Sequence, residues 1–260
     1  MTHLDLIDTH AHIDSEPFDG DRDACLARAR AVGVQRIISI GASRGIASAH
    51  TSIALAERHP DVWASVGIHP HDAGQDLALG ELEALAQHPK VVAIGETGLD
   101  FFRDWSPRER QYALFEHQID LAIRVSKPLI IHSREAGEEC IRVLTERSAQ
   151  RVGGVFHCYA ENAAFAERLQ KIGFLVSFPG VLTFKKSDAM RAVAKEIPLE
   201  QIMVETDAPY MAPEPNRGKR CEPAFVVDTA RALAAVKGLP LGEVAAITTQ
   251  NALRLFSTMR

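Results

Sequence analysis

Eight short apolar runs, separated by amphipathic helical patterns, recur from one end of this 260-residue chain to the other. Most of the runs are continuous stretches of valine, isoleucine and leucine rather than strict alternations of apolar and polar residues. Continuous apolar strands are typical of parallel sheets that helices cover on both faces. The runs occupy residues 4–7, 36–40, 62–66, 91–94, 129–131, 154–156, 174–177 and 202–204, and the clearest helical patterns occupy 21–32, 46–59, 108–125, 138–148, 162–172, 189–195 and 241–256.

Eight parallel strands, each followed by a helix, close into a TIM (β/α)8 barrel, and we predict this α/β fold for the chain. The length fits one barrel of about 250 residues, so residues 1–260 are expected to form one domain. The alternative is an open doubly wound sheet, which often carries a glycine-rich phosphate turn after its first strand. Here the first run ends in His-x-His with no Gly-x-Gly-x-x-Gly, which favours the barrel. The irregular segment 208–222, rich in proline and charge, is expected to be a loop over the barrel mouth.

Side chains of the kinds that bind metals follow five of the apolar runs. In a TIM barrel the carboxyl ends of all strands meet at one face, so these side chains are expected to converge. His10 and His12 lie two residues apart, and in extended backbone both point the same way. The full set of expected metal ligands is His10, His12, Glu96, His132, His157 and Asp207.

Four histidines and two carboxylates exceed what one tetrahedral ion binds. They suit two divalent ions about 3.5–4 Å apart with a shared carboxylate. Glu96 is the expected bridge, because its two oxygens can face one ion each and its charge screens the repulsion between the ions. Imidazoles favour zinc-like ions, while two carboxylates admit Mn²⁺ or Mg²⁺. A single histidine at a strand end is more often a hydrogen-bonded rim residue than a ligand, but six such side chains at five strand ends together favour a metal site.

The remaining histidines do not share this placement. His69 follows the third run, on the expected face but outside the set that two metals need, and a contact with a substrate phosphate is its expected role. Cys158 directly follows His157, and the alternation of side chains along a strand predicts that it packs as a small hydrophobic residue away from the site. Structural or solvent-exposed roles are expected for His3, His50, His59, His88 and His117, which precede a strand or lie on helical patterns.

Charge and cysteine content limit the classes of partner and the compartment. The net charge of −5 argues against general electrostatic binding of duplex nucleic acid, but it is compatible with a local phosphate-binding site. Four scattered cysteines without a Cys-x-x-Cys motif are expected to be reduced thiols, which indicates a cytoplasmic protein. The apolar stretches are strand-sized, so no transmembrane helix is expected. Charged side chains in the first apolar run exclude a secretory signal peptide, and no obligate protein partner is evident.

These motifs, taken as an ordered set, resemble the TatD family of metal-dependent deoxyribonucleases within the amidohydrolase superfamily. The resemblance covers essentially the whole chain and rests on DTHAH (8–12), GIHP (67–70), GETGLD (95–100), IHSR (131–134), HCY (157–159) and ETDAPY (205–210). The following NRGK (216–219) is similar to the subgroup typified by bacterial YcfH-like proteins. The resemblance implies a TIM barrel with His10, His12, Glu96 and Asp207 around one metal. It implies Glu96, His132 and His157 around the other.

Such a site predicts hydrolysis by a two-metal-activated hydroxide. Two cations lower the pKa of a shared water towards about 7, and Asp207 is expected to accept its proton as general base while also binding a metal. Glu96 is expected to be catalytic through its bridging position. Glu205 shares the orientation of Asp207, and we expect it either to support a ligand histidine from behind or to be buried for structural reasons.

Three functions fit this chemistry. The first is a deoxyribonuclease that acts on single-stranded or 3′-end DNA, because a barrel mouth admits a chain end more readily than intact duplex. The second is a hydrolase of a small ester, amide or aminoacyl-tRNA, and the third is a non-enzymatic metal-binding or scaffold protein. Phosphate chemistry requires cations at the mouth, and the candidates are Arg134, in the loop after the fifth run, with Arg217, Lys219 and Lys185. For the charged run at 217–220 the competing interpretation is a solvated surface.

Overall fold

The eight strands form one parallel sheet in which neighbours along the chain are neighbours in space, in the order β1 to β8. The structure is a computed structural model that describes residues 4–75, 77–103 and 105–259. The strands are β1 (Leu6–Ala11), β2 (Val34–Gly41), β3 (Val62–Val66), β4 (Val91–Asp100), β5 (Leu129–Arg134), β6 (Gly154–Phe156), β7 (Phe174–Phe178) and β8 (Ile202–Val204). The predicted TIM barrel is therefore confirmed.

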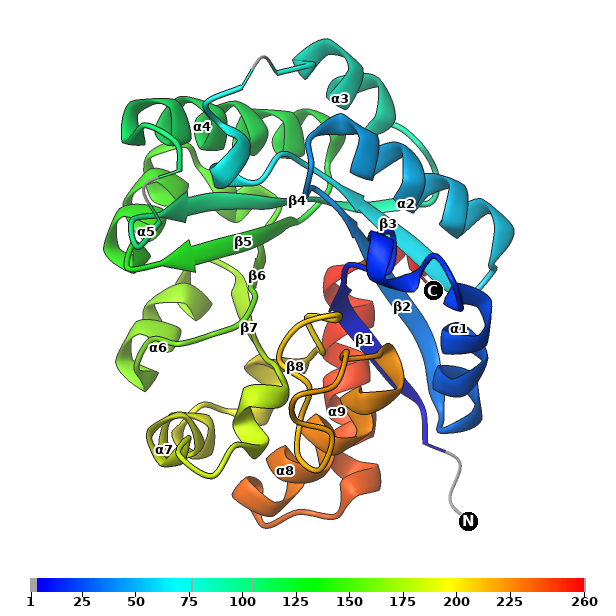
Figure 1. Ribbon diagram of the computed structural model, residues 1–260. Coiled ribbons are helices and arrows are strands. Elements are labelled where there is room, and N and C mark those ends of the chain that lie inside the picture. Colours follow the sequence, from blue (N-terminus) through cyan, green and yellow to red (C-terminus); the bar gives the residue numbers. More distant parts are fainter. Residues whose placement is uncertain (1–3, 76, 104, 260) are drawn as a thin grey trace.

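Helices surround the strands on the outside of the barrel (Figure 1). They are α1 (Arg22–Ala31), α2 (Ile46–Arg58), α3 (Leu79–Leu85), α4 (Arg108–Val125), α5 (Gly137–Glu146), α6 (Ala163–Lys171), α7 (Asp188–Glu196), α8 (Val226–Lys237) and α9 (Leu241–Leu255). Local chemistry fixes several helix ends. The side chain of Asn162 accepts the backbone N–H of Phe165 at the start of α6, and Gly238 ends α8 in the left-handed conformation that glycine adopts without strain.

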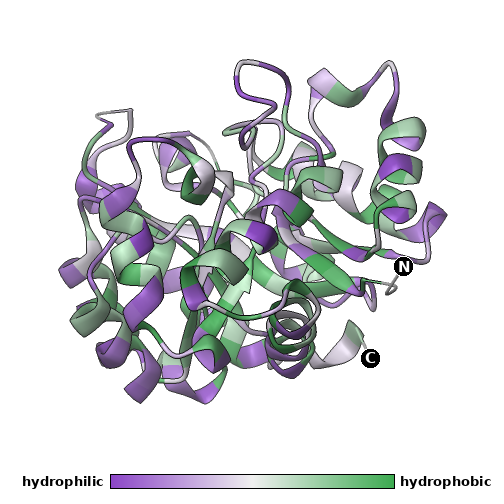
Figure 2. Cartoon of the chain, turned by 90° about the horizontal axis from the view of Figure 1, so that it is seen from below, coloured by the Kyte–Doolittle hydropathy of each residue, from purple (hydrophilic) through white to green (hydrophobic). Residues whose placement is uncertain are grey.

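Two apolar clusters explain why the strands read as continuous apolar runs. Along β2, Ile37 belongs to the larger cluster, which also contains helix residues, whereas its neighbour Ile38 belongs to the smaller one. The smaller cluster joins Ile7 of β1 to Ile130 of β5, and side chains from opposite walls can meet only inside the barrel. Both faces of each strand are thus covered by apolar groups. Hydrophobic residues accordingly concentrate on the central strands and hydrophilic residues on the outer helices (Figure 2).

The seam between β1 and β8 closes at the mouth of the barrel. Ala11 forms a parallel bridge with Ala208, the backbone N–H of Asp207 donates to the carbonyl of His10 at 2.9 Å, and that of His12 donates to Ala208 at 2.7 Å. Below this seam, the buried carboxylate of Asp8 accepts the backbone N–H and the hydroxyl of Thr206. The seam therefore holds Asp207 beside the two histidines of β1.

Three strands extend at least three residues further towards the mouth than the apolar pattern predicts. β1 runs to Ala11, β4 to Asp100 and β5 to Arg134, and β4 and β5 continue to pair through Gly98 with His132 and Asp100 with Arg134. Backbone hydrogen bonds do not require apolar side chains, so polar residues extend a strand past its buried part. The prediction that Arg134 lies in a loop is therefore wrong, since it ends β5. The segment 208–222 contains no helix or strand, and its residues Tyr210 and Met211 line the mouth, as predicted for a loop there.

Within residues 4–75, 77–103 and 105–259, no single helix has the length and apolar character needed to cross a membrane. The segments Pro223–Lys237 and Leu241–Leu255 satisfy the length and composition test only as a pair, and a bend of 110° separates them.

Candidate metal centre

Glu96 occupies the centre of the barrel mouth, and its two carboxylate oxygens face different sets of side chains. The oxygen Oε2 lies 3.4 Å from Nε2 of His10 and 3.6 Å from Nε2 of His12. Oδ1 of Asp207 lies 3.7 Å and 3.5 Å from the same two nitrogens. These four side chains, from β1, β4 and the segment after β8, form one set.

The other oxygen of Glu96, Oε1, faces the second set. Nε2 of His157 lies at 2.8 Å and Nδ1 of His132 at 2.9 Å from it. The ligand atoms of Glu96, His132 and His157 lie within 4.8 Å of one another, as do those of His10, His12 and Glu96. All six predicted ligands are therefore brought together, in two sets that share Glu96.

The donor chemistry of both sets fits divalent cations. Nε2 of His10 and Nε2 of His12 lie 3.3 Å apart, and two imidazole nitrogens at this distance need either a proton or a cation between them. Imidazole and carboxylate are the ligands that zinc and related ions take in catalytic sites. Residues of this chemistry, converging at the open end of a barrel, suit a metal centre.

Ionisation of the two carboxylates is strongly favoured in this surrounding. Burial opposes the charge on Glu96, but the positive charge of His157 and hydrogen bonds from His10 and His132 outweigh it and hold the pKa of Glu96 well below its ordinary range. Burial also opposes the charge on Asp207, and its pKa is nevertheless lowered, chiefly by the hydrogen bond from His12. Both groups are thus anionic at neutral pH.

The histidines divide into two kinds. Burial opposes the charged imidazole in every case, but the neighbouring carboxylates outweigh it for three of them. Glu96 and Glu205 raise the pKa of His157 well above its usual value, and the pKa values of His12 and His132 are also raised by their carboxylate partners. For His10 and His69 burial prevails and the pKa is lowered, to about 4 for His69. Without a bound cation, protons on these raised-pKa histidines therefore balance the negative charge of the carboxylates.

Two buried carboxylates support the second set from behind. Oε1 of Glu205 accepts the backbone N–H of Cys158 at 2.6 Å and lies 3.5 Å from Nδ1 of His157. Oδ2 of Asp100 lies 3.0 Å from Nε2 of His132 and 2.7 Å from Nε2 of His71. Carboxylates in this position fix the tautomer and orientation of an imidazole. Glu205 was identified in the sequence, whereas Asp100 was not, although it lies four residues after Glu96 in the same motif.

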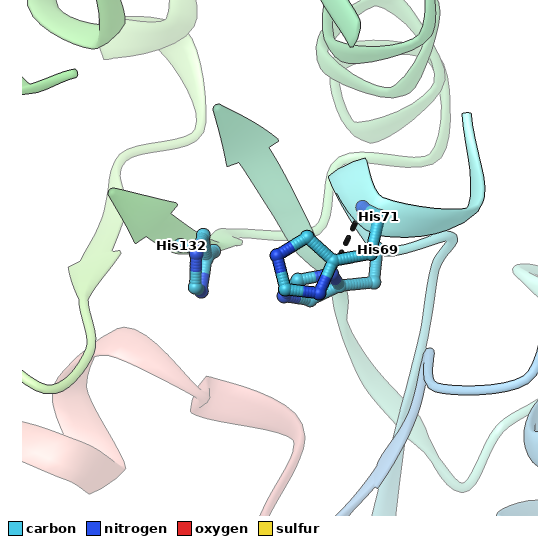
Figure 3. Close-up of side chains that lie close together, drawn as sticks. All are labelled: His69, His71 and His132. Carbon is cyan, nitrogen blue, oxygen red and sulfur yellow. Dashed lines mark hydrogen bonds between the residues drawn. The ribbon is translucent and has the colours of Figure 1, made fainter. Parts of the chain in front are cut away.

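His69 is held as a hydrogen-bond donor rather than a metal ligand. Its Nδ1 accepts the backbone N–H of His71 at 3.1 Å, the dashed line in Figure 3. A neutral imidazole that accepts at one nitrogen carries its proton on the other, so Nε2 of His69 donates towards Oε1 of Glu96 at 3.3 Å. His69, His71 and His132 lie close enough to form a third candidate cluster, but this tautomer leaves His69 without a lone pair for an ion.

The mouth opens into a cavity of about 880 Å³ lined by members of both sets. Arg134 lines it, as do Arg44 and Arg103, which sequence reasoning missed because their positions depend on the paths of loops. Neither Arg217 nor Lys219 is among the lining residues, and the guanidinium of Arg217 packs over the ring of Phe184 at 3.8 Å. Of the predicted cations, Arg134 alone lines the cavity.

Cys158 departs from its predicted position. β6 ends at Phe156, so the alternation of a strand does not reach the next two residues. His157 and Cys158 both line the cavity, and Cys158 has a positive φ of 49°. The prediction that this thiol faces away is therefore wrong.

The outer histidines lie away from the mouth. His50, His59, His88 and His117 each contact one surface carboxylate, as expected for structural or solvated residues. His3 lies outside the described residues.

Comparison with known proteins identifies the family. The family model described as "TatD related DNase" matches residues 7–257. A Bacillus subtilis protein named "Uncharacterized metal-dependent hydrolase YabD" is 41% identical over 255 residues, which cover 96% of this chain and 98% of that protein. The chain belongs to the TatD family. The resemblance predicted from the sequence is thus confirmed, and with it an enzyme of a metal-dependent hydrolase family.

Two further TatD relatives place the chain within the family. An Erwinia tasmaniensis protein named "3'-5' ssDNA/RNA exonuclease TatD" is 33% identical over 260 residues, covering 97% of this chain and all of that protein (100%). The crystal structure of YJJV, a TatD homologue from Escherichia coli K12, superposes with a TM-score of 0.89 at 34% identity, covering 97% of this chain and 98% of that one. The TatD barrel is therefore shared over nearly the full length of each chain.

Proposed function

We propose that this TatD-family protein is a divalent-metal-dependent deoxyribonuclease that removes nucleotides from the 3′ end of single-stranded DNA. The observation that carries the proposal is the position of Glu96, whose two oxygens face two separate sets of ligand-type side chains. Two-metal centres with a shared carboxylate are common in enzymes that cleave phosphodiester bonds. The Erwinia relative, named as an exonuclease of single-stranded DNA and RNA, supports this choice of substrate.

Two ions would be held by the two sets described above. His10, His12 and Asp207 would hold one ion and His132 and His157 the other, with Glu96 between them. When bound, zinc, manganese or magnesium ions lower the pKa of water towards about 7 and neutralise charge on a phosphoryl group. Glu205 and Asp100 would keep the imidazoles of His157 and His132 in the orientation that this binding requires.

The remaining steps belong to side chains of the cavity wall. Asp207 is ionised and lines the cavity, so it is placed to accept a proton from the attacking water as general base. Nε2–H of His69 would donate to a phosphoryl oxygen, which gives this histidine the substrate contact predicted from the sequence. Arg134, at the end of β5, would bind a non-bridging oxygen. Arg217 and Lys219 lie outside the cavity wall and would contact only more distant phosphates.

The test is a reconstitution series. Metal-stripped protein is loaded separately with Zn²⁺, Mn²⁺ or Mg²⁺ and offered end-labelled single-stranded DNA, duplex DNA, aminoacyl-tRNA and a simple ester. We expect metal-dependent release of mononucleotides from the 3′ end of the single strand and slow attack on blunt duplex. Rapid cleavage of aminoacyl-tRNA or of the ester, with DNA left intact, would favour the alternative hydrolase and overturn the nuclease proposal.

The metal content is measured on the same preparations. Elemental analysis and anomalous scattering are expected to show two ions per chain. A fully loaded protein with a single ion, and with His132 or His157 unliganded, would contradict the two-metal arrangement.

We also propose a cytoplasmic location, because all four cysteines are free thiols.

A further inference from the structure

Large exposed apolar side chains gather at the mouth of the barrel. Among the residues that the structure describes, four large hydrophobic side chains are strongly exposed, and three of them are aromatic: Phe102 at 51%, Trp105 at 63% and Tyr210 at 59%. The fourth, Val32, lies at the end of α1. Exposed apolar side chains scattered singly are normal, whereas a group of them at a groove is typical of a binding site.

Two of these aromatic rings border the metal centre from different sides. Trp105, in the segment after β4, has its ring 4.4 Å from that of His71, which lies 5.9 Å from the ring of His132. Tyr210, in the segment after β8, has its ring 6.1 Å from that of His12. Both side chains line the cavity above Glu96. A group stacked on either ring would therefore lie beside the metal centre.

Guanidinium groups are interleaved with the aromatic rings. Arg134 lies over the ring of Phe102 at 3.9 Å, and Arg103 lies 5.0 Å from the ring of Trp105 and 5.5 Å from that of Phe102. Arg103 and Arg134 both line the cavity. These guanidinium groups lie on the cavity wall although the protein as a whole carries a net charge of −5. Flat apolar rings alternating with positive charges match the alternating bases and phosphates of a nucleic acid strand.

We infer that Trp105 and Tyr210 are stacking platforms for unpaired bases of the strand whose terminal phosphodiester enters the metal centre. This inference rests on the proposed function and specifies how its substrate is recognised. A paired base has its faces covered by its neighbours, whereas a base at a single-stranded end can leave the stack and lie on an aromatic ring. Every base has a flat face, so the platforms select single strands without selecting sequence. Arg103 and Arg134 hold the phosphates between the stacked bases.

The test compares four variants on two substrates. Trp105→Ala and Tyr210→Ala each remove a platform, Trp105→Phe retains a smaller ring, and Val32→Ala is the matched control, because it shortens an exposed apolar residue that does not line the cavity. The substrates are a single-stranded oligonucleotide and the same strand with abasic nucleotides at its 3′ end. All assays use the metal-loaded protein.

Loss of one stacked base is expected to raise KM by about 5- to 150-fold, with a much smaller change in kcat. The wild-type protein should show a similar rise on the abasic strand, and Trp105→Ala should show little further rise there, because the platform and the base act as a pair. Trp105→Phe should restore part of the affinity, and Val32→Ala should behave as wild type. An independent readout is available because the chain has only two tryptophans. In a Trp63→Phe background, a hydrolysis-resistant phosphorothioate strand should quench the fluorescence of Trp105.

The outcomes separate this inference from the proposed function. If the wild-type protein cleaves single-stranded DNA while both alanine variants keep its KM, or if it cleaves the abasic strand equally well, the stacking inference is wrong and the nuclease proposal stands. If the wild-type protein cleaves no DNA under any metal, the nuclease proposal fails first and the inference falls with it.

Discussion

Nine of the histidines that the structure describes form two groups that pair with carboxylates in opposite ways. On the outer helices and loops each histidine contacts one carboxylate at the surface, for example His50 with Glu81 at 2.6 Å and His88 with Glu57 at 3.2 Å. At the mouth, five histidines contact the single carboxylate of Glu96. The five are His10, His12, His69, His132 and His157.

The difference shows which feature marks a metal centre. A His–Glu distance of about 3 Å occurs in both groups, so a single histidine–carboxylate pair does not indicate a metal centre. One carboxylate cannot hydrogen-bond five imidazoles well, and four of these histidines are buried. Convergence and burial together, rather than pairing, favour a metal centre.

The largest effect is expected from removing the shared carboxylate. Glu96→Ala should reduce metal-dependent hydrolysis to background and lower the bound metal, because two cations would lose their common ligand. Glu81→Ala, which removes the partner of an outer histidine, should leave both unchanged. Turnover and metal content are measured on the same samples, with circular dichroism as a check of folding. Equal losses in Glu96→Ala and His69→Ala would show that Glu96 is not the bridge.

The next effect concerns Asp207, to which we assign metal binding and proton transfer. Asparagine still offers a carbonyl oxygen to a metal but cannot accept a proton at neutral pH. Asp207→Asn should therefore retain substantial metal while turnover falls by about 10²- to 10⁴-fold. An Asp207→Asn protein with both metals and near-normal turnover would leave this residue a ligand only.

His69 differs from the other mouth histidines because its tautomer makes it a donor. His69→Ala should raise KM by about 10- to 150-fold, the usual contribution of a hydrogen bond to a charged group, with a smaller effect on kcat. His69→Gln keeps an N–H donor and should recover part of the loss. Steady-state kinetics on single-stranded DNA give both constants. A loss of bound metal in His69→Ala would instead make this histidine a ligand.

The sequence could predict those site residues whose positions depend on nearby residues in the chain. It could not predict those whose positions depend on where a strand ends or on the path of a loop. Glu96 and His132 were identified because the end of an apolar run is a local feature and the barrel brings all of these ends to one face. Asp100 and Trp105 were missed because their positions depend on how far β4 extends and on the loop that follows it. Cys158 was misplaced for a related reason, since the end of β6 decides where its side chain points.

The stability of the metal-free protein should vary with pH because the histidines at the mouth gain and lose protons. The pKa of His157 is raised above the ordinary value of 6.5, so its contribution to stability is fully present below that pH and is lost as pH rises through the folded-state pKa. The pKa of His69 is lowered to about 4, so its contribution is present above 6.5 and is lost as pH falls towards 4. The contributions of these two histidines, taken together, should therefore be greatest near pH 6.5 without metal.

Metal should move this optimum upward, because ligand histidines bind metal only when deprotonated. Thermal unfolding of the metal-free and zinc-loaded proteins across this pH range provides the measurement. A metal-free protein whose Tm rises steadily beyond the ordinary histidine range would contradict the assignment of His157 as a protonated partner of Glu96.

The smallest effect is expected in the outer group. Glu57→Gln removes the charge that faces His88 across 3.2 Å, but the side chain of Glu57 is 59% exposed and water screens the pair. The free energy of unfolding should change by less than about 0.5 kcal/mol, and hydrolysis should be unaffected. Urea titration at low and high salt measures the change, and the small difference should shrink further in high salt because exposed charges are screened. A loss above about 2 kcal/mol, or any loss of bound metal, would mean that outer pairs are coupled to the mouth. The contrast between one-to-one pairing at the surface and convergence on Glu96 would then no longer hold.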